Sequence, residues 1–503
     1  MSLLSARKHQ GWACATAAAV LFAALPGLSQ APPPQQEPQI ERLNRAPVSK
    51  EVLKVNIPKA QEAVLENGLT VLVLEDRRFP VVTLQLQISG AGPLYEPGNL
   101  PGLASVTAQM LREGTKTRNA RAITDEVDQL GATLNAGAGF GSMNTVINAS
   151  GLSDNFDQWF ALVSDVVLNP SFPAEEMNRL KQRLQAQLRQ QRANPGFLMT
   201  EKFFHAAYGQ HPAGVRSMTP ESIQGMTPET VTRWHGERYA PQNAILAVAG
   251  DVSARELIAK VRATLGGWKK TSATDALPAS LKPASSRRVL LVNRPDSVQT
   301  NLMLGNLAID RLSPDYYPMV VMDQVVGATN LSRLFTNLRE RKGYTYGANS
   351  NLITLKYLGP WLAASAVRTE VTEGAMNEFL YEINRIRDEK VPAGELEDAK
   401  RAIVASFALS LEQPGQLLNF SILRKVYGLP DNTWETYPAA ILAVTADDVQ
   451  RVARKYLNVD ALQIVAVGDG AKIKSVMEKY GPVEMFDAAG KPVAASPSGS
   501  GSN

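Results

Sequence analysis

The chain of 503 residues is too long for one typical domain, and its 44% hydrophobic content is enough for more than one large core. Charged residues make up 20% of the chain, and the formal net charge is only +4. This near balance excludes the strongly basic surface of nucleic-acid-binding proteins. We therefore predict a globular protein of at least two domains with no nucleic-acid partner.

The first thirty residues have the pattern of a secretory signal peptide. A basic start, SARKHQ, precedes the apolar run WACATAAAVLFAALPGL, which is too short to span a bilayer comfortably and is broken at Pro26 and Gly27. We predict removal of residues 1–30 and export to the periplasm, with an uncleaved anchor as the alternative. Cys14 is the only cysteine and lies inside this segment, so the mature chain would carry no thiol and no disulfide.

Low-complexity segments mark the borders of the predicted domains. Residues 31–51 are rich in Pro and Gln and are predicted to be an extended linker. A second linker is predicted over 269–287, and a disordered tail over 487–503. These borders leave an N-terminal domain over 52–268 and a C-terminal domain over 288–486.

The two predicted domains repeat one pattern. The stretches MTPETVTRWHGERYAPQNAILAVAGD (226–251) and VTADDVQRVARKYLNVDALQIVAVGD (444–469) are offset by about 218 residues. In each, a Thr followed by acidic residues would cap an amphipathic helix, and an apolar strand then ends in Gly-Asp. Each half also opens with alternating strands, LTVLVLED and VVTLQLQIS in the first and RRVLLVN and NLMLGNLA in the second. We predict an α+β fold of two homologous domains, each an antiparallel sheet packed by helices.

Two further stretches carry composition signals. LNAGAGFGSMNTVINASG is rich in glycine, but it lacks the spacing of a phosphate loop and leads into no helix, so we predict a sheet edge. Such an edge can pair with an extended peptide through main-chain hydrogen bonds. NRLKQRLQAQLRQQR is predicted to be a helix with a solvated basic face, and a subunit contact is the alternative. Its basic residues are Arg179, Lys181, Arg183, Arg189 and Arg192.

A series of motifs in order resembles the insulinase and pitrilysin family of zinc peptidases, the inverzincins. These motifs are LENGLTVLVLED, YEPGNLPGLA, LGATLNA, LNPSFPAEEMNR, YAPQNAILAVAGDV and SRLFTNLRERKGYTYG. The chain is most similar to the short two-domain bacterial members related to the mitochondrial processing peptidase subunits, over about Val64 to Gly468. The resemblance implies two homologous domains that form half of a clam-shell chamber.

The resemblance also implies a zinc site that the residues of this chain do not supply. Active members carry His-x-x-Glu-His on the helix that here reads GLASVTAQM, where Ser105, Ala108 and Gln109 take the places of the two ligands and the general base. The third ligand is a Glu on a later helix, and Gln187 stands in its place. Hydroxyl and amide groups are poor zinc ligands. We expect this chain to hold no metal and to hydrolyse no peptide alone.

The histidines outside the predicted signal peptide offer no substitute site. His205, His211 and His235 lie at spacings that match no metal-ligand pattern, and we interpret each as a surface or core histidine.

The second half retains a different part of the family pattern. NLSRLFTNLRERKGYTYGA resembles the substrate-binding signature of the second domain, with Arg339 on a helix, Gly343 ending that helix and Tyr346 just beyond. The resemblance implies that the phenol stabilises the oxyanion of a tetrahedral intermediate and that the guanidinium holds substrate carbonyls. From the residues alone, a surface Arg and a packed Tyr remain the alternative.

Together these features predict a noncatalytic, zinc-less subunit of a periplasmic heteromeric metallopeptidase. It would supply Arg339 and Tyr346 in trans to the zinc site of an active His-x-x-Glu-His partner, in a heterodimer that cleaves peptides. Zinc is expected in the partner, and no transmembrane span is expected in the mature chain. A peptide-binding or scaffold protein of the same fold with no role in hydrolysis is the alternative. For a catalyst with other chemistry, the sequence offers no constellation of residues.

Overall fold

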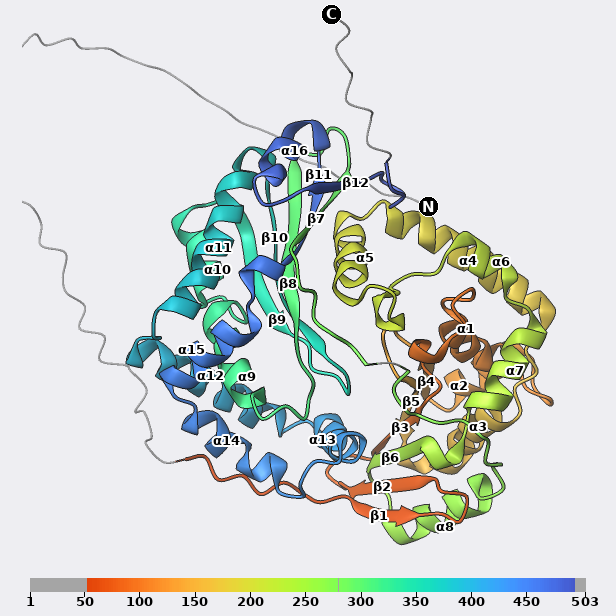
Figure 1. The fold of residues 1–503 in the computed structure, drawn as a ribbon. Helices are drawn as coiled ribbons and strands as arrows, with labels where there is room; N and C mark the ends of the chain where they lie inside the picture. Colours follow the sequence, from red (N-terminus) through yellow and green to blue (C-terminus); the bar gives the residue numbers. More distant parts are fainter. Residues whose placement is uncertain (1–51, 279, 494–503) are drawn as a thin grey trace, which may run out of the picture. The chain divides into compact units, whose positions relative to one another are not determined.

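A computed structural model describes residues 52–278 and 280–493, which contain two six-stranded sheets, one in each half of the sequence (Figure 1). The predicted signal peptide and the linker over 31–51 lie outside the described residues. So do the last ten residues of the predicted tail.

The first sheet has the strand order β1-β2-β6-β3-β5-β4. Its strands are β1 (Gln61–Val64), β2 (Thr70–Glu75), β3 (Val81–Ser89), β4 (Thr133–Gly137), β5 (Asn144–Leu152) and β6 (Ala244–Gly250). The helices of this half are α1 (Leu103–Met110), α2 (Ala120–Gln129), α3 (Phe156–Leu168), α4 (Ala174–Arg192), α5 (Pro195–Tyr208), α6 (Pro220–Gly225), α7 (Pro228–Arg238) and α8 (Ala254–Leu265).

The second sheet has the strand order β12-β7-β11-β8-β10-β9. Its strands are β7 (Arg288–Asn293), β8 (Gln299–Ile309), β9 (Thr345–Leu352), β10 (Gly359–Arg368), β11 (Gln463–Gly468) and β12 (Val483–Phe486). The helices are α9 (Tyr316–Val326), α10 (Arg333–Phe335) with a π-helix over Thr336–Arg341, α11 (Thr372–Asp388), α12 (Ala393–Ser410), α13 (Pro414–Tyr427), α14 (Thr433–Ala443), α15 (Ala446–Tyr456) and α16 (Gly470–Glu478).

The predicted α+β fold of two sheets packed by helices is confirmed, with one correction to strand direction. β6 pairs parallel with β2 and antiparallel with β3, and in the second sheet β11 pairs parallel with β7 and antiparallel with β8. β12 also pairs parallel with β7. The reason is geometric: a late strand inserted between two antiparallel strands must run parallel to one of them. The sheets are therefore mixed rather than purely antiparallel.

The predicted sequence repeat is a structural repeat. α7 begins after Thr227 and α15 after Thr445, and each Thr side chain accepts the backbone N–H three residues on, within a capping box. Each helix then leads to the strand inserted into the middle of its sheet, β6 or β11. The two stretches thus perform the same structural task in the two halves.

The central strands of the two sheets, among them β2, β6 and β11, are buried on both faces because the two halves exchange helices. In β2, Val71 and Val73 belong to the core of the first half, whereas Leu72 and Leu74 pack with residues of α13, which comes from the second half of the sequence. In the second sheet, α5 from the first half packs on β8 and β11 through residues such as Phe203. Figure 1 shows α5 beside the second sheet and α13 beside the first. One helix of each predicted domain therefore packs on the sheet of the other domain.

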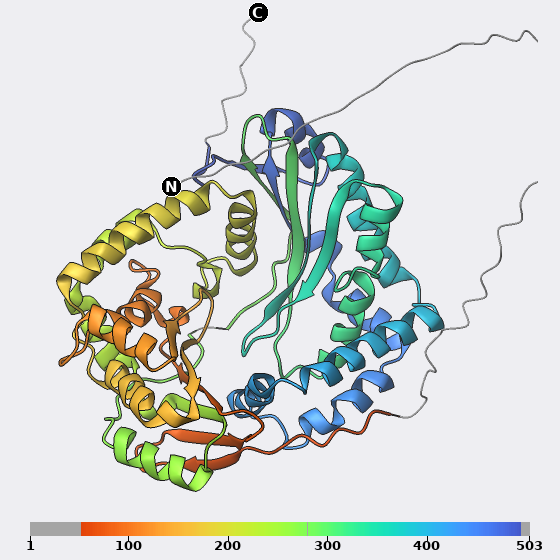
Figure 2. The ribbon, with the colours of Figure 1, turned by 180° about the vertical axis from the view of Figure 1, so that it is seen from behind.

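On the opposite face of the second sheet lie the helices of its own half. Figure 2 shows the cyan and blue helices along that face. Their buried side chains form one core with alternate residues of β7 and β8, among them Val289 and Leu302. This core contains α9 and α11, the helices that support the elements carrying Arg339 and Tyr346.

The predicted linker over 269–287 and the first residues of the predicted tail make hydrogen bonds to the rest of the chain. The described residues of the predicted linker over 269–287 form no helix or strand, and the backbone carbonyl of Asp275 accepts a hydrogen bond from the Tyr95 hydroxyl at 2.8 Å. At the other end, residues 487–493 turn back on β12, and Val493 N–H donates to the Met485 carbonyl at 2.9 Å. The predicted disordered tail therefore starts too early, because these backbone groups are hydrogen-bonded.

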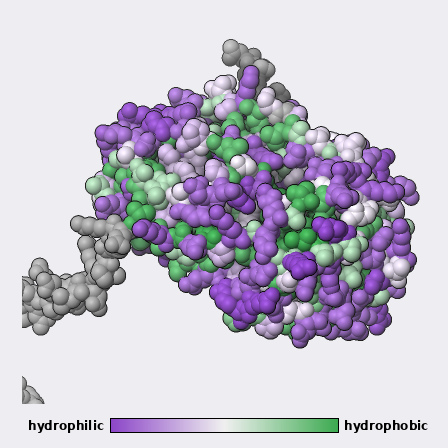
Figure 3. All heavy atoms as spheres, turned by 90° about the horizontal axis from the view of Figure 1, so that it is seen from below, coloured by the Kyte–Doolittle hydropathy of each residue, from purple (hydrophilic) through white to green (hydrophobic). Residues whose placement is uncertain are grey.

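One face of the described part of the chain is mainly polar. Hydrophilic residues predominate on the face drawn in Figure 3, with smaller hydrophobic areas between them. Among the helices of residues 52–278 and 280–493, none is both long and apolar enough to cross a membrane.

Candidate functional site

The helix α1 is held by a carboxylate from the preceding loop. Gly102, with φ of 96°, offers no side chain to cap the helix, and Glu96 accepts the backbone N–H groups of Gly102 and Ala104, each at 2.7 Å. Burial raises the pKa of Glu96 to about 7 against these two donors, which favour the anion. The motif YEPGNLPGLA therefore has a structural task of its own, which is to start α1.

The face of α1 that would carry metal ligands holds two side chains that hydrogen-bond to each other and one that is buried. Gln109 Nε2 donates to the Ser105 hydroxyl at 3.2 Å, and Ala108 is fully buried. The side chains at these three positions are an amide, a hydroxyl and a methyl group, which do not fit zinc. The geometry thus leaves neither a ligand pair nor a general base on this helix.

A small polar cleft next to Gln109 carries positive charge where a metal would need ligands. The cleft has a volume of about 330 Å³ and is lined by Gln109, Arg112, Glu113 and Arg183 among others. The one carboxylate among these four, Glu113, is paired with Arg183 at 3.1 Å. Gln187, one turn along α4 from Arg183, is exposed, and the described residues provide it no hydrogen bond to α1. A hydrogen bond thus joins Ser105 and Gln109, and none within the described residues joins Gln187 to them.

The histidines have structural surroundings. His235 Nε2 lies 2.8 Å from the Val167 carbonyl, and burial lowers its pKa to about 4, so the ring stays neutral at ordinary pH. His211 Nδ1 accepts the Ala213 N–H at 3.1 Å. Within residues 52–278 and 280–493, no group of three or more His, Cys, Asp or Glu side chains is arranged to hold a metal ion. The zinc that the family pattern implies therefore does not fit the residues of this chain.

The basic helix α4 uses its cations mostly within the chain. Arg192 forms a two-pronged ion pair with Glu201 at 2.5 and 2.7 Å, Arg179 pairs with Glu175 and Glu176, and Lys181 donates to the Gln224 carbonyl. These contacts involve three of the five basic residues, Arg183 pairs with Glu113, and Arg189 is exposed.

Arg339 lies in a π-helix, a form that is rare and is found disproportionately at functional sites. Lys342 N–H donates to the Asn337 carbonyl five residues back at 3.0 Å, and Gly343 ends the helix with φ of 62°, as the sequence predicted. The Arg339 side chain is 45% exposed, and within the described residues its ion pair is with the adjacent Glu340 at 3.4 Å and its ring contact is with Phe335. Exposed pairs of this kind hold a side chain weakly, so the guanidinium can bind a partner.

The backbone beneath Arg339 is firmly anchored. Asn337 is buried and donates to Glu378 at 2.9 Å and to Glu382 at 2.8 Å, both on α11. Lys342 also pairs with Glu378 at 2.8 Å. The helix is therefore fixed, while the side chain of Arg339 is 45% exposed.

Tyr346 lies on β9, the edge strand of the second sheet, and is 89% exposed. The pairing with β10 shifts at this place: Thr345 faces Val367 and Ala348 faces Ser365, so two residues of β9 oppose one of β10. A bulge of this kind redirects a side chain. Two hydroxyl groups stabilise the bulge, because Thr345 donates to the Ala366 carbonyl at 2.7 Å and Ser365 donates to the Gly347 carbonyl at 2.8 Å.

The far end of β9 is anchored by a buried carboxylate. Asp323 on α9 accepts from the Ser350 hydroxyl at 2.5 Å, the Leu352 N–H at 3.2 Å and the Trp361 indole at 2.8 Å. Burial raises the pKa of Asp323 to about 6 against these donors. β9 is thus fixed at one end by Asp323 and shaped at the other by the bulge that exposes Tyr346.

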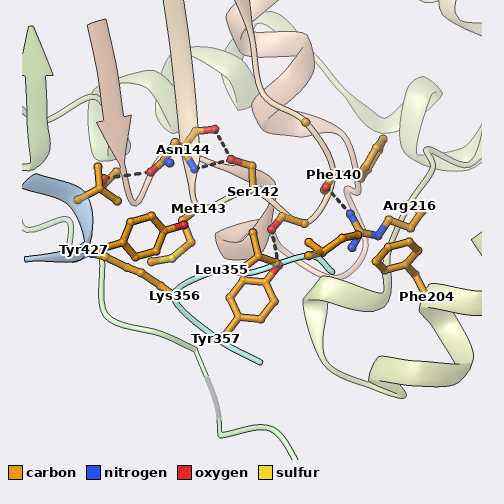
Figure 4. A pocket seen from close by; sticks show the side chains of 15 residues that line it. Phe140, Ser142, Met143, Asn144, Phe204, Arg216, Leu355, Lys356, Tyr357 and Tyr427 are labelled. Atoms are coloured by element: carbon orange, nitrogen blue, oxygen red, sulfur yellow. Dashed lines mark hydrogen bonds between the residues drawn. The ribbon is translucent and has the colours of Figure 1, made fainter. Parts of the chain in front are cut away.

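The glycine-rich segment forms the predicted sheet edge and lines a small cavity. β4 is the edge strand of the first sheet, and the turn that follows it places Phe140 and Gly141 against the second half (Figure 4). Arg216 donates to the Phe140 carbonyl at 2.7 Å, and the Tyr357 hydroxyl donates to the Gly141 carbonyl at 2.5 Å. This cavity has a volume of about 240 Å³.

Sequence reasoning missed three features of these sites: the Glu113–Arg183 pair, the hydroxyls at the bulge and Asp323. Glu113 and Arg183 are 70 residues apart, so no local pattern joins them. The sequence YTYG does carry a signal for the bulge, because a glycine inside a strand often marks one.

Two family models match the chain one after the other. Residues 70–221 match the model described as Insulinase (Peptidase family M16), and residues 225–403 match the model described as Peptidase M16 inactive domain. The chain belongs to the insulinase (M16) peptidase family.

Relatives of similar length within the M16 family agree with this assignment. An uncharacterized zinc protease of Rickettsia bellii is 26% identical over 412 residues, which cover 80% of this chain and 96% of that protein. An uncharacterized zinc protease of Bacillus subtilis is 22% identical and covers 80% of this chain and 97% of its own length.

Solved M16-like structures share the fold. The crystal structure of a peptidase M16 inactive domain from Pseudomonas fluorescens matches with a TM-score of 0.76 at 29% identity, covering 81% of this chain and 98% of that one. The structure of a protease from Helicobacter pylori matches with a TM-score of 0.75 at 20% identity, covering 82% and 100%. The second likeness shows the fold alone.

Proposed function

We propose that this chain is a noncatalytic, zinc-less subunit of a periplasmic heteromeric metallopeptidase. In this assembly Arg339 and Tyr346 contact the substrate in the zinc site of an active family partner. One observation carries the proposal: Tyr346 is almost fully exposed on a bulged edge strand, beside a π-helix that presents Arg339, while the metal helix of the same chain has lost its ligands. The exported location rests on the signal pattern in residues 1–30.

The chemistry of the two side chains fits a supporting role in peptide hydrolysis. When water attacks a peptide carbonyl, negative charge develops on the carbonyl oxygen, and a phenol hydroxyl can donate a hydrogen bond to it. A guanidinium offers several donors in a fixed plane and can hold peptide carbonyls on either side of the reacting bond. Neither side chain needs to change protonation state, so both act by binding and orienting. The zinc and the general base would come from the partner.

Pre-organisation of these groups supports the proposal. Asn337 anchors the π-helix from below, and Thr345 and Ser365 hold the bulge, so neither element must reorganise when a substrate arrives. Preorganised donors are effective because they cost no rearrangement during the reaction. A tyrosine that served only packing would be buried, and Tyr346 is not.

The test is steady-state cleavage of a fluorogenic peptide by an active His-x-x-Glu-His partner reconstituted with this chain. We expect Tyr346→Phe to lower turnover roughly 10²-fold to 10³-fold, since that is the usual cost of losing one oxyanion donor. Arg339→Ala should lower turnover and also weaken substrate binding. Arg341→Ala is the matched control, because Arg341 is an exposed arginine two residues from Arg339, and it should leave activity unchanged.

The second candidate, a scaffold or peptide-binding protein, makes the opposite prediction. If both variants assemble with the partner and support full activity, Arg339 and Tyr346 take no part in hydrolysis, and the scaffold role replaces the proposal. Co-purification of the two chains is measured in parallel, so that a loss of assembly is not mistaken for a loss of chemistry.

A further inference from the structure

The second half contains a larger cavity that the proposed function does not use. Its volume is about 510 Å³, within the range of ordinary small-molecule sites. Four helices contribute to its walls, α9, α12, α13 and α14, together with the residues that follow β8 and β9. Six of the lining side chains are Arg311, Tyr316, Phe407, Phe420, Trp434 and Tyr437.

Arg311 is the charged group of this cavity, and it is buried. Only 8% of the residue is exposed, and its guanidinium lies 3.7 Å from the ring centre of Tyr316 and 6.0 Å from that of Trp434. Its Nη2 has no hydrogen-bond partner, and no carboxylate of the described residues lies within ion-pair distance of it. A buried guanidinium with free donors therefore borders the cavity.

The nearby acidic side chains are bound elsewhere. Asp315 pairs with Arg451 at 2.7 Å and with Lys455 at 2.9 Å, and Asp310 accepts the Leu312 N–H at 2.9 Å. Arginine does not lose its proton in proteins, so the charge of Arg311 persists. A buried charge without a partner is costly, and stacking on an aromatic ring offsets that cost only in part. An anion in the cavity would supply the missing partner.

The remaining walls are suited to an apolar body. Phe407, Phe420, Trp434 and Tyr437 form a chain of ring contacts with centre distances of 4.4 to 6.3 Å. The Trp434 indole donates to the Phe420 carbonyl at 3.0 Å, so its ring is held in place. Rigid aromatic walls of this kind bind apolar groups by burial and contact.

We propose that this cavity binds a monocarboxylate with an apolar body, the carboxylate pairing with Arg311 and the body lying against the aromatic rings. Planar two-pronged pairing with carboxylates is what guanidinium groups do best. Two sources share this chemistry: a medium-chain fatty acid, and the C-terminal residue of a hydrophobic peptide. The site is independent of Arg339 and Tyr346, and binding requires no partner subunit.

The test is isothermal titration of the full chain with four probes: decanoate, decanol, a short peptide ending in leucine with a free carboxyl, and the same peptide as its amide. We expect decanoate or the free-acid peptide to bind, and the probe that binds identifies the source. Arg311→Gln should weaken binding of that acid by roughly 10-fold to 100-fold, as expected for a charged hydrogen bond, and should leave the neutral analogue unaffected. Arg401→Gln is the matched control, since Arg401 is an exposed arginine of α12, and it should change nothing.

A second variant keeps the test decisive if Arg311→Gln fails to fold. Ser406 lies at the exposed rim of the cavity, so Ser406→Trp blocks the entrance without disturbing a core. It should abolish binding of the acid. The proposal is overturned if the wild-type chain binds neither acid, if the neutral analogue binds as well as the acid, or if Ser406→Trp binds like the wild type.

Discussion

Asp323 makes the stability of the second half depend on pH in an unusual direction. Most carboxylates stabilise a folded protein when ionised, but burial raises the pKa of Asp323 to about 6 from an ordinary value of 3.8. Between these two values the folded protein holds the proton more tightly than the unfolded chain. The stability that the protonated Asp323 contributes to the folded state is therefore fully present below about pH 4, and it is lost as the pH rises through 6. The difference between the two pKa values corresponds to about 3 kcal/mol.

The measurement compares the wild type with Asp323→Asn by urea unfolding at several pH values from about 4 to about 7. The free energy of unfolding of the wild type relative to the variant should increase by about 3 kcal/mol from neutral to acidic pH. Trp361 donates to Asp323, so its fluorescence reports the same region. The Asn side chain can still accept hydrogen bonds from Ser350 and Trp361. Because Asn does not titrate, any loss of stability that the substitution itself causes is the same at every pH and cancels in the comparison.

Asp315→Asn is the control with the opposite sign. Asp315 is buried, and hydrogen bonds from Lys455, Tyr456 and Arg451 lower its pKa to about 2 even though burial alone would raise it. The stability that the ionised Asp315 contributes is present above its ordinary pKa of 3.8 and is lost as the pH falls toward 2. The difference in free energy of unfolding between the wild type and Asp315→Asn should therefore stay constant between about pH 5 and pH 7. A pH-independent difference for Asp323→Asn would refute the reasoning, because it would show that the carboxyl group titrates alike in both states.

The remaining predictions concern metal, capping, helix exchange and export. Metal analysis after dialysis should find no stoichiometric zinc, and one tightly held zinc per chain would contradict the account of Gln109 and its neighbours. Glu96→Ala should lower the free energy of unfolding by about 2–3 kcal/mol, because two N–H groups of α1 lose a charged acceptor; an effect below the error of urea titration would contradict it. Phe203→Ala and Phe420→Ala, each in a core formed across the halves, should cost about 3–5 kcal/mol apiece and lower the melting temperature of the whole chain; loss of one half alone would show that the halves unfold separately. N-terminal sequencing of the protein from the cell envelope should find residues 1–30 removed, and an intact Met1 would contradict export.

Much of the local structure could be predicted from the sequence because it depends on neighbouring residues. The side chains of Thr227 and Thr445 cap their helices by accepting the backbone N–H group three residues further along the chain. The strands that follow are likewise predicted from the alternation of residue types over a few positions. Gly343 ends its helix because a left-handed backbone conformation favours glycine. The absence of His and Glu side chains at Ser105, Ala108 and Gln109, where the family resemblance implies two zinc ligands and a general base, can likewise be read from the sequence alone.

Other features could not be predicted because they join residues far apart in the chain. The run TVLVLE in β2 is apolar on both faces, which predicts a strand covered on both sides but does not say by what; α13, more than 300 residues away, covers one of them. The mixed strand directions arise from pairings between strands far apart in the sequence: β6 and β11 each insert between two earlier strands, and β12 pairs parallel with β7 at the edge of its sheet.

The same division applies to the candidate sites. The identities of Arg339 and Tyr346 were evident from a short motif, but their exposure depends on Asn337, Ser365 and the pairing of β9 with β10, which only the folded chain brings together. The isolation of Arg311 is also a tertiary property, since Asp310 lies next to it in sequence yet bonds to another group. Sequence determines which chemical groups are present and their local backbone form. Their burial, their pairing and the cavities between them follow from packing over long separations, where local patterns carry no information.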